Sequence, residues 1–225
     1  MNVIPQRVKD TLVGYVGPLA RALIRSGVHP NTITTLGTLL VIGSGVAFGF
    51  GEIRLGGALL LLSGIFDVLD GQVARQGGMT TTFGAFYDST LDRVGEGAVF
   101  SGLIFYFLTG PLPSELKMRA VGAGLVALVC SLIVSYARAR SEALGVENKV
   151  GIAARAERIL LLGLPALFFG SGPGRPAVLL FWIVVVLAIV SAITVVQRVV
   201  HVARVARGAP PPSPFPKRDT LPVIA

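Results

Sequence analysis

Long apolar runs recur along this 225-residue chain, and they limit its fold more than any other feature. Several of them approach or exceed the ~20 residues that a helix needs to cross a hydrocarbon core about 30 Å thick. Only 14% of the residues are charged, whereas soluble domains carry about 25%. The sequence therefore predicts an all-α, polytopic membrane protein.

Segments rich in Gly, Pro and other turn-forming residues divide the apolar sequence into six predicted transmembrane helices. Residues 1–30 mix Arg and Lys with Val, Leu and Ile at helical spacing, which predicts an amphipathic helix in the membrane interface. Residues 1–207 then form one membrane domain, and the Pro-rich residues 208–225 are predicted to be a disordered cytoplasmic tail. The predicted spans of the six-helix bundle, residues 32–200, are 32–50, 56–75, 84–109, 118–141, 152–170 and 176–200.

Basic residues are distributed unevenly across the predicted topology. Sixteen of the twenty Lys and Arg lie on the side that holds both termini. Because Lys and Arg are concentrated in cytoplasmic loops, both termini are predicted to be cytoplasmic and the location to be the plasma membrane. The net charge of +8 is then explained by an anionic lipid surface, and no nucleic-acid partner is expected. The opposite side holds only Arg54, Lys117, Arg119 and Arg175.

Four aspartates, Asp67, Asp70, Asp88 and Asp92, fall inside two of the predicted spans. Ionised carboxylates are costly inside a bilayer, so acidic residues there usually mark a functional site. Spacings of three and four residues place the members of each pair on one helix face. A short connection predicts that the two helices are antiparallel neighbours, which would bring both pairs together. A site with oxygen ligands alone favours Mg²⁺, Mn²⁺ or Ca²⁺ over zinc.

Small and basic residues accompany these carboxylates. Gly71, Ala74 and Gly84 leave space in which a phosphate-bearing ligand could approach the backbone, and the neighbouring Arg75 suits a diphosphate. The alternative is structural, with the aspartates forming buried salt bridges to Arg75 and Arg93. Four carboxylates in two helical pairs favour the functional interpretation.

The pattern D-x2-D-G-x2-A-R-x8-G-x3-D-x3-D from Asp67 to Asp92 resembles the signature of the CDP-alcohol phosphotransferases, with every specified position matched. The six-span layout with a leading interfacial helix extends the resemblance over nearly the whole chain. The resemblance implies transfer of a phosphate-bearing group from a CDP-linked lipid, usually CDP-diacylglycerol, to an acceptor hydroxyl, with release of CMP. A homodimer is also expected from the family.

The resemblance also implies roles for individual residues. Asp67, Asp70 and Asp88 would bind two divalent cations, Mg²⁺ or Mn²⁺, on the diphosphate. Asp92 would be the general base for the acceptor hydroxyl and would also contact a metal. The implied residues of the CDP and diphosphate site are Asp67, Asp70, Gly71, Ala74, Arg75, Gly84, Asn31 and Thr34.

Three arginines toward the predicted cytoplasmic side, Arg138, Arg158 and Arg198, bear on the acceptor. Arginine binds phosphate through parallel charge-assisted hydrogen bonds, so these residues suit an acceptor that itself carries a phosphate. The stretch from Ser135 to Arg158 resembles the branch formed by phosphatidylinositol-phosphate synthases and their archaeal ether-lipid equivalents, which implies inositol 1-phosphate. Glycerol 3-phosphate, the acceptor of a phosphatidylglycerophosphate synthase, would satisfy the same arginines and stays open.

Two other classes of membrane protein place aspartates in a bilayer. Aromatic prenyltransferases carry a duplicated pattern rich in Asn and Asp along a longer chain, whereas a single motif occurs here. A cation-coupled transporter would use the aspartates as cation sites and would not release CMP.

Overall fold

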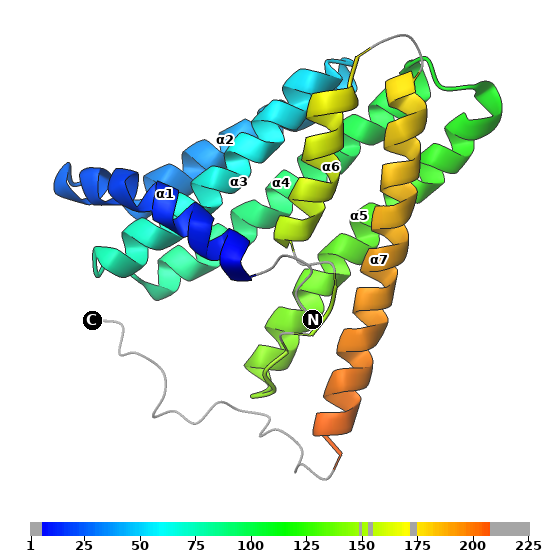
Figure 1. The fold of residues 1–225 in the computed structure, drawn as a ribbon. Helices are drawn as coiled ribbons and strands as arrows, with labels where there is room; N and C mark the ends of the chain where they lie inside the picture. Colours follow the sequence, from blue (N-terminus) through cyan, green and yellow to red (C-terminus); the bar gives the residue numbers. More distant parts are fainter. Residues whose placement is uncertain (1–5, 149, 153–154, 172–174, 208–225) are drawn as a thin grey trace.

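The computed structural model describes residues 6–148, 150–152, 155–171 and 175–207. The predicted disordered tail, residues 208–225, lies outside them. The described part contains only helices, turns and loops, and no strand (Figure 1). In chain order the helices are α1 (Gln6–Arg25), α2 (Pro30–Gly49), α3 (Ile53–Gln76), α4 (Thr82–Thr109), α5 (Ser114–Ala143), α6 (Arg155–Phe169) and α7 (Arg175–Val205).

Each of the six predicted spans coincides with one of the helices α2 to α7. Helices α2, α5 and α7 are long and apolar enough, by length and composition, to cross a membrane. Helices α3, α4 and α6 do not meet the same criteria. Helix α6 has only 15 residues, and α3 and α4 carry the four aspartates. The all-α class is therefore confirmed, and the number of spans stays a prediction. Helix α1 lies within the segment predicted to be interfacial and packs against α3 (Figure 1).

Helix α2 packs against both α3 and α4, whereas α3 and α4 have little direct contact with each other. Helices α3 and α4 are therefore not packed closely against each other, as a pair of neighbours was predicted to be, and each packs mainly against α2. Helix α3 packs on its other side against α6, and α5 packs against α4 and α7. Figure 1 shows α5 and α7 side by side over much of their length.

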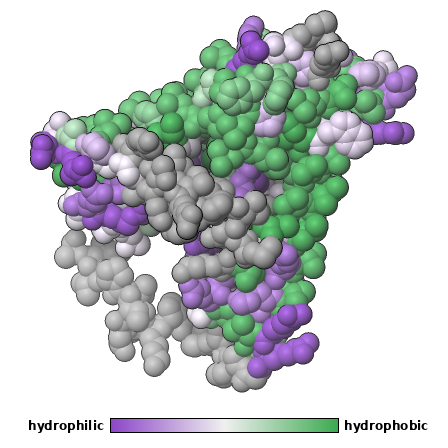
Figure 2. All heavy atoms as spheres, in the orientation of Figure 1, coloured by the Kyte–Doolittle hydropathy of each residue, from purple (hydrophilic) through white to green (hydrophobic). Residues whose placement is uncertain are grey.

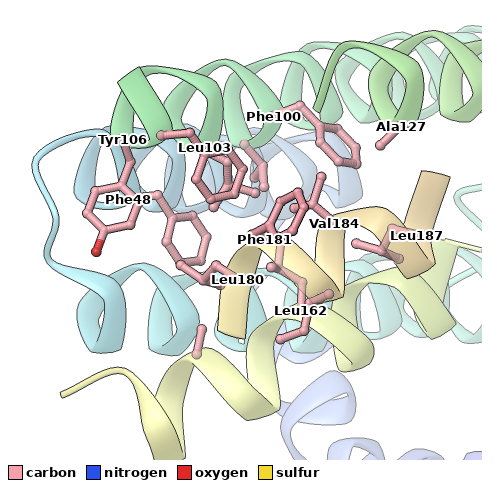
Figure 3. Close-up of a cluster of buried hydrophobic side chains, with 14 of the residues drawn as sticks. Phe48, Phe100, Leu103, Tyr106, Ala127, Leu162, Leu180, Phe181, Val184 and Leu187 are labelled. Carbon is pink, nitrogen blue, oxygen red and sulfur yellow. The ribbon is translucent and has the colours of Figure 1, made fainter. Parts of the chain in front are cut away.

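Aromatic and branched side chains fill the space between α2, α4, α6 and α7 (Figure 3). Phe48, Leu103 and Phe107 are fully buried there, and Leu180 and Phe181 reach them from α7. Helices in lipid gain little from the hydrophobic effect when they associate, so close van der Waals packing must hold them together. This interdigitated cluster supplies that packing.

The outer surface of the bundle is apolar. Large hydrophobic side chains such as Phe105, Trp182 and Val196 are exposed. In Figure 2 the hydrophobic surface extends over the helices, and hydrophilic residues gather toward their ends. A soluble protein rarely exposes so much contiguous apolar surface, and this distribution suits a bundle surrounded by lipid.

Glycine allows α3 and α6 to touch through their backbones. A Cβ atom at Gly57 would lie 2.7 Å from the amide nitrogen of Leu167 and 2.9 Å from the carbonyl oxygen of Gly163. Gly57→Ala is therefore expected to push the two helices apart and to lower stability by about 1–3 kcal/mol, the usual cost of overpacking. The measurement is the thermal unfolding midpoint of the purified protein in detergent.

Gly122→Ala on α5 is the matched control, because a Cβ atom there meets nothing within 4 Å. It is expected to leave the midpoint unchanged or to raise it, since Ala is the better helix former. Equal midpoints for Gly57→Ala and wild type would contradict the close contact between α3 and α6.

Candidate active site

The N-termini of α2 and α4 meet at one end of the bundle, and both are capped. Pro30 occupies the first turn of α2, where its missing N–H costs nothing, and His29 accepts a hydrogen bond from the Asn31 amide at 3.2 Å. Thr81 caps α4 by accepting a hydrogen bond from the Gly84 amide at 2.9 Å. A Cβ atom at Gly84 would lie 3.4 Å from Asn31 Oδ1. The two N-termini therefore lie close together at Gly84 and Asn31.

A cavity of about 210 Å³ opens between these N-termini and the C-terminal turns of α3. Helix N-termini favour bound anions, because their first N–H groups lack partners within the helix. Seven of the eight residues predicted to bind the CDP and diphosphate line this cavity, and Asp88 lines it too. The lining residues are Pro30, Asn31, Thr34, Asp70, Gly71, Ala74, Arg75, Met79, Thr80, Thr81, Gly84, Ala85 and Asp88.

Asp70 is buried at the wall of this cavity. Thr34 Oγ1 of α2 donates a hydrogen bond to Asp70 Oδ2 at 2.7 Å. A charge-assisted hydrogen bond of this length holds the carboxylate in one orientation. The contact between α2 and α3 therefore aims Asp70 at the cavity, together with Asp88 from α4.

Asp67 and Asp92 do not line the cavity and are paired with Arg155 in the first turn of α6. The guanidinium of Arg155 lies 3.2 Å from Asp67 Oδ2 and also pairs with Asp92. Asp92 lies 3.4 Å from Arg93 as well. Asp67 and Asp92 therefore do form ion pairs, as the structural alternative proposed. Their main partner is Arg155 and not Arg75.

The donor chemistry of the four aspartates fits hard divalent cations, since it offers carboxylate oxygens alone. Asp70 lies close enough to Asp67 and Asp88 for their negative charges to interact. Within the described residues, no three side chains of the metal-ligating types converge closely enough to form a metal-binding group. Two of the four carboxylates are instead directed at Arg155.

The three arginines predicted to bind the acceptor phosphate lie at different depths. Arg158 is buried and paired with Glu96 of α4. Arg198 is buried too, and donates hydrogen bonds to the backbone carbonyls of Val150, at 3.0 Å, and Val134. Arg138 is exposed and bonded to Glu142 at 2.9 Å. The positive charges of Arg138 and Arg158 both act on Arg198, so the three lie in one region.

Beyond this geometry, the sequence matches the CDP-alcohol phosphatidyltransferase family over residues 27–206, which is most of the chain. This protein belongs to the CDP-alcohol phosphatidyltransferase family. The chain is therefore a transferase, and the resemblance drawn from the aspartate signature is confirmed. Nothing in this match supports the alternatives of a prenyltransferase or a transporter.

Relatives within the CDP-alcohol phosphatidyltransferase family match most of the chain. The phosphatidylinositol phosphate synthase of Mycobacteroides abscessus is 38% identical over 203 residues, 89% of each chain. That of Cutibacterium acnes is 41% identical, over 84% of this chain and 92% of its own. The archaetidylinositol phosphate synthase of Methanothermobacter thermautotrophicus is 36% identical, over 87% and 96%.

Crystal structures of the phosphatidylinositol phosphate synthase of Mycobacterium tuberculosis share the fold. The structure with CDP-DAG bound has a TM-score of 0.71 at 35% identity and covers 83% of this chain and 92% of its own. The structure with manganese and citrate has a TM-score of 0.72, also at 35% identity, and covers 84% and 88%.

Two residues of this phosphatidyltransferase fold that stand out in the structure were missed at the level of sequence. Glu96 continues the spacing of Asp88 and Asp92 by one more turn of α4, and that i+4 spacing was a usable signal. Arg155 stands at the start of an apolar helix, where a basic residue is typical of ordinary flanking charge. Its pairing with Asp67 and Asp92 depends on how α6 packs, which its local sequence does not encode.

Proposed function

We propose that this chain transfers the phosphatidyl group of CDP-diacylglycerol to a hydroxyl of inositol 1-phosphate and releases CMP. The proposal rests mainly on the cavity of about 210 Å³, which gathers the family's signature residues in a chain related to phosphatidylinositol phosphate synthases. The bound CDP-DAG in the Mycobacterium tuberculosis structure supports the choice of lipid substrate.

The cavity suits the nucleotide and diphosphate of the lipid. Gly71, Ala74 and Gly84 have little or no side chain there, so a flat or phosphate-bearing group can approach the helix backbones. Arg75 is exposed at the rim, where it can reach a phosphate. Asn31 and Thr34 lie on one face of the first turns of α2, whose N-terminal dipole favours negative charge.

Two divalent cations, Mg²⁺ or Mn²⁺, would be held by Asp67, Asp70, Asp88 and Asp92 and would neutralise negative charge on the diphosphate during transfer. The manganese in the Mycobacterium tuberculosis structure supports this assignment. Arg155 lies among the same carboxylates, where its positive charge offsets their mutual repulsion. Thr34 keeps Asp70 directed at the cavity through its 2.7 Å hydrogen bond.

Asp92 acts as general base on the acceptor. Its carboxylate takes the proton of the acceptor hydroxyl as that oxygen forms a bond to the phosphorus attached to diacylglycerol. The bond from this phosphorus to the bridging oxygen breaks, and CMP leaves with the electron pair. A base positioned in this way also orients the nucleophile for an in-line attack.

The phosphate of the acceptor binds at the arginines. Arg138, Arg158 and Arg198 lie in one region, and three positive charges favour an acceptor that carries its own phosphate over serine or free inositol. The inositol phosphate specificity in the names of the relatives favours inositol 1-phosphate over glycerol 3-phosphate.

Membrane placement follows from the same chemistry. The cavity, the aspartates and the arginines belong to the side richer in basic residues, which we assign to the cytoplasm together with both termini. Acceptor entry from the cytoplasm and lipid entry from the inner leaflet of the plasma membrane are then both possible. We further propose that the protein works as a homodimer and that α1 lies in the membrane interface.

The direct test is CMP release by the purified protein from CDP-diacylglycerol, with Mg²⁺ or Mn²⁺ and one acceptor at a time. Inositol 1-phosphate, glycerol 3-phosphate, serine and free inositol are compared at equal concentration. We expect inositol 1-phosphate to exceed the unphosphorylated acceptors by at least about tenfold, because loss of a charged hydrogen-bonded group costs about 1.5 kcal/mol or more. Chelation of the metal is expected to abolish release.

The alternatives give distinct results. Preference for glycerol 3-phosphate would make the chain a phosphatidylglycerophosphate synthase and would leave the roles of the aspartates intact. Ion flux that depends on the divalent metal, with no CMP release for any acceptor, would favour a transporter and would overturn the proposed function.

A further inference from the structure

Two ion pairs, one helical turn apart, join α4 to α6. One of them involves Glu96, which has no role in the proposed reaction. Arg155 of α6 pairs with Asp92 of α4, and Arg158 pairs with Glu96. The arginines are three residues apart and the acids four, so each pair of neighbours spans about one helical turn. The two ion pairs therefore fix the position of α6 along α4.

Glu96 is also bonded to a third helix. Its side chain is buried, and its Oε2 accepts a hydrogen bond from Ser131 of α5 at 2.9 Å. Arg93 Nε lies 3.7 Å from the same oxygen. One carboxylate thus links α4, α5 and α6 immediately beside the aspartates.

The surroundings of Glu96 make this arrangement costly. A small cavity of about 40 Å³ beside it is lined mostly by apolar residues, with Arg155 and Arg158 among the few charged ones. Removing two charges from water costs several kcal/mol per ion, and well-packed apolar residues often serve stability equally well. A buried carboxylate at this place is better explained by what it orients than by the stability it adds.

The group that Glu96 orients is the guanidinium of Arg158. This group is planar, and its N–H donors have fixed directions, so an ion pair at one nitrogen sets the plane of all of them. Arg158 and Arg155 lie on the same helix, and Arg155 is tied to Asp92. The Glu96 pair therefore sets the position of an acceptor-phosphate arginine relative to the base.

We propose that Glu96 is a positioning residue that holds Arg158 at a fixed place relative to Asp92 and so determines how the phosphorylated acceptor is bound. This inference rests on the proposed function. It assigns to Glu96 an effect on the acceptor and none on the CDP-linked lipid. Ser131 supports the same carboxylate from α5.

Steady-state kinetics with inositol 1-phosphate and CDP-diacylglycerol test the proposal. Glu96→Gln is expected to raise the acceptor KM about tenfold, which corresponds to the loss of one charge-assisted contact. The KM for CDP-diacylglycerol is expected to change less than about twofold, because Glu96 does not line the nucleotide cavity. Glu96→Asp keeps the charge and is expected to recover much of the acceptor affinity. Glu115→Gln, at the start of α5, is the matched control with no expected effect.

A double mutant separates positioning from general structural support. If Glu96 acts through Arg158, Glu96→Gln added to Arg158→Gln raises the acceptor KM no further than Arg158→Gln alone. If the two substitutions instead raise the acceptor KM by factors that multiply, the proposal is wrong. Equal increases in the KM of both substrates for Glu96→Gln would also overturn it. If Glu96→Gln does not fold, the Ser131→Ala variant, which removes the 2.9 Å hydrogen bond to Glu96, carries the same comparison of the two KM values.

The outcome for the wild-type protein distinguishes this inference from the function on which it rests. If the wild-type protein releases no CMP with any phosphorylated acceptor, both the proposed function and the role of Glu96 are wrong. Active wild-type protein whose acceptor KM is unchanged by Glu96→Gln overturns the role of Glu96 alone.

Discussion

Asp70→Asn is expected to lower turnover on the order of a thousandfold. Asp70 is the buried carboxylate at the wall of the nucleotide cavity. An amide carries no charge and is a poor ligand for a hard divalent cation, whose charge stabilisation is worth several kcal/mol in phosphoryl transfer. About 4 kcal/mol corresponds to a thousandfold in rate. The measurement is CMP release at saturating CDP-diacylglycerol, metal and acceptor.

The fold is expected to survive this change, because the amide oxygen of the substituted side chain can still accept the hydrogen bond that Thr34 now donates to Asp70 at 2.7 Å. Thermal unfolding of the variant checks this point. Glu52→Gln removes one carboxylate just before α3, far from the cavity, and is the matched control with turnover near that of wild type. Turnover of Asp70→Asn within about tenfold of wild type, with metal present, would exclude Asp70 as a metal ligand.

Seven of the eight residues that the resemblance implied for the nucleotide site line the cavity, and helical spacing explains part of this arrangement. Asn31 and Thr34 are three residues apart, and Asp70 and Ala74 are four apart, so each pair shares one helix face. The N-terminus of α4 was also predictable, since Thr81 is a good capping residue. These features depend on neighbours within a few residues, which the sequence displays directly.

The predicted pairs of aspartates are divided in the structure for a reason that lies outside their own helices. Residues three or four apart share a helix face, but their side chains still differ in direction by about 60° or about 40°, so the two members of a pair can contact different helices. Asp70 faces Thr34 on α2, whereas Asp67 faces Arg155 on α6. Asp88 and Asp92 are divided in the same way between the cavity and Arg155. Which helix packs on which face is set by tertiary contacts, and local spacing does not report it.

Local sequence did not reveal the partners of the three arginines either. Basic residues near helix ends identified Arg138, Arg158 and Arg198 as one functional set. The structure gives them different partners: an exposed carboxylate, a buried carboxylate and two backbone carbonyls. The buried partners come from segments distant in sequence, so only the packing of α4, α5, α6 and α7 could reveal them.

Asp92→Asn is expected to lower kcat by about a hundredfold to ten-thousandfold, the usual contribution of a positioned general base. The amide cannot take the proton of the acceptor hydroxyl. The KM for CDP-diacylglycerol is expected to stay within about threefold, because Asp92 does not line the nucleotide cavity and three other aspartates remain to hold the cations. Steady-state measurements with each substrate varied in turn separate these two effects.

Thr90→Ala is the control for Asp92, because Thr90 is exposed on the same helix and its hydroxyl donates a hydrogen bond to the carbonyl oxygen of Phe86, one turn earlier. Its kinetics are expected to match wild type. Near-normal kcat for Asp92→Asn with divalent metal bound would refute its role as base. A loss of CDP-diacylglycerol affinity as large as the loss of kcat would instead make Asp92 chiefly a ligand of the diphosphate site, because the variant would then have lost ground-state binding.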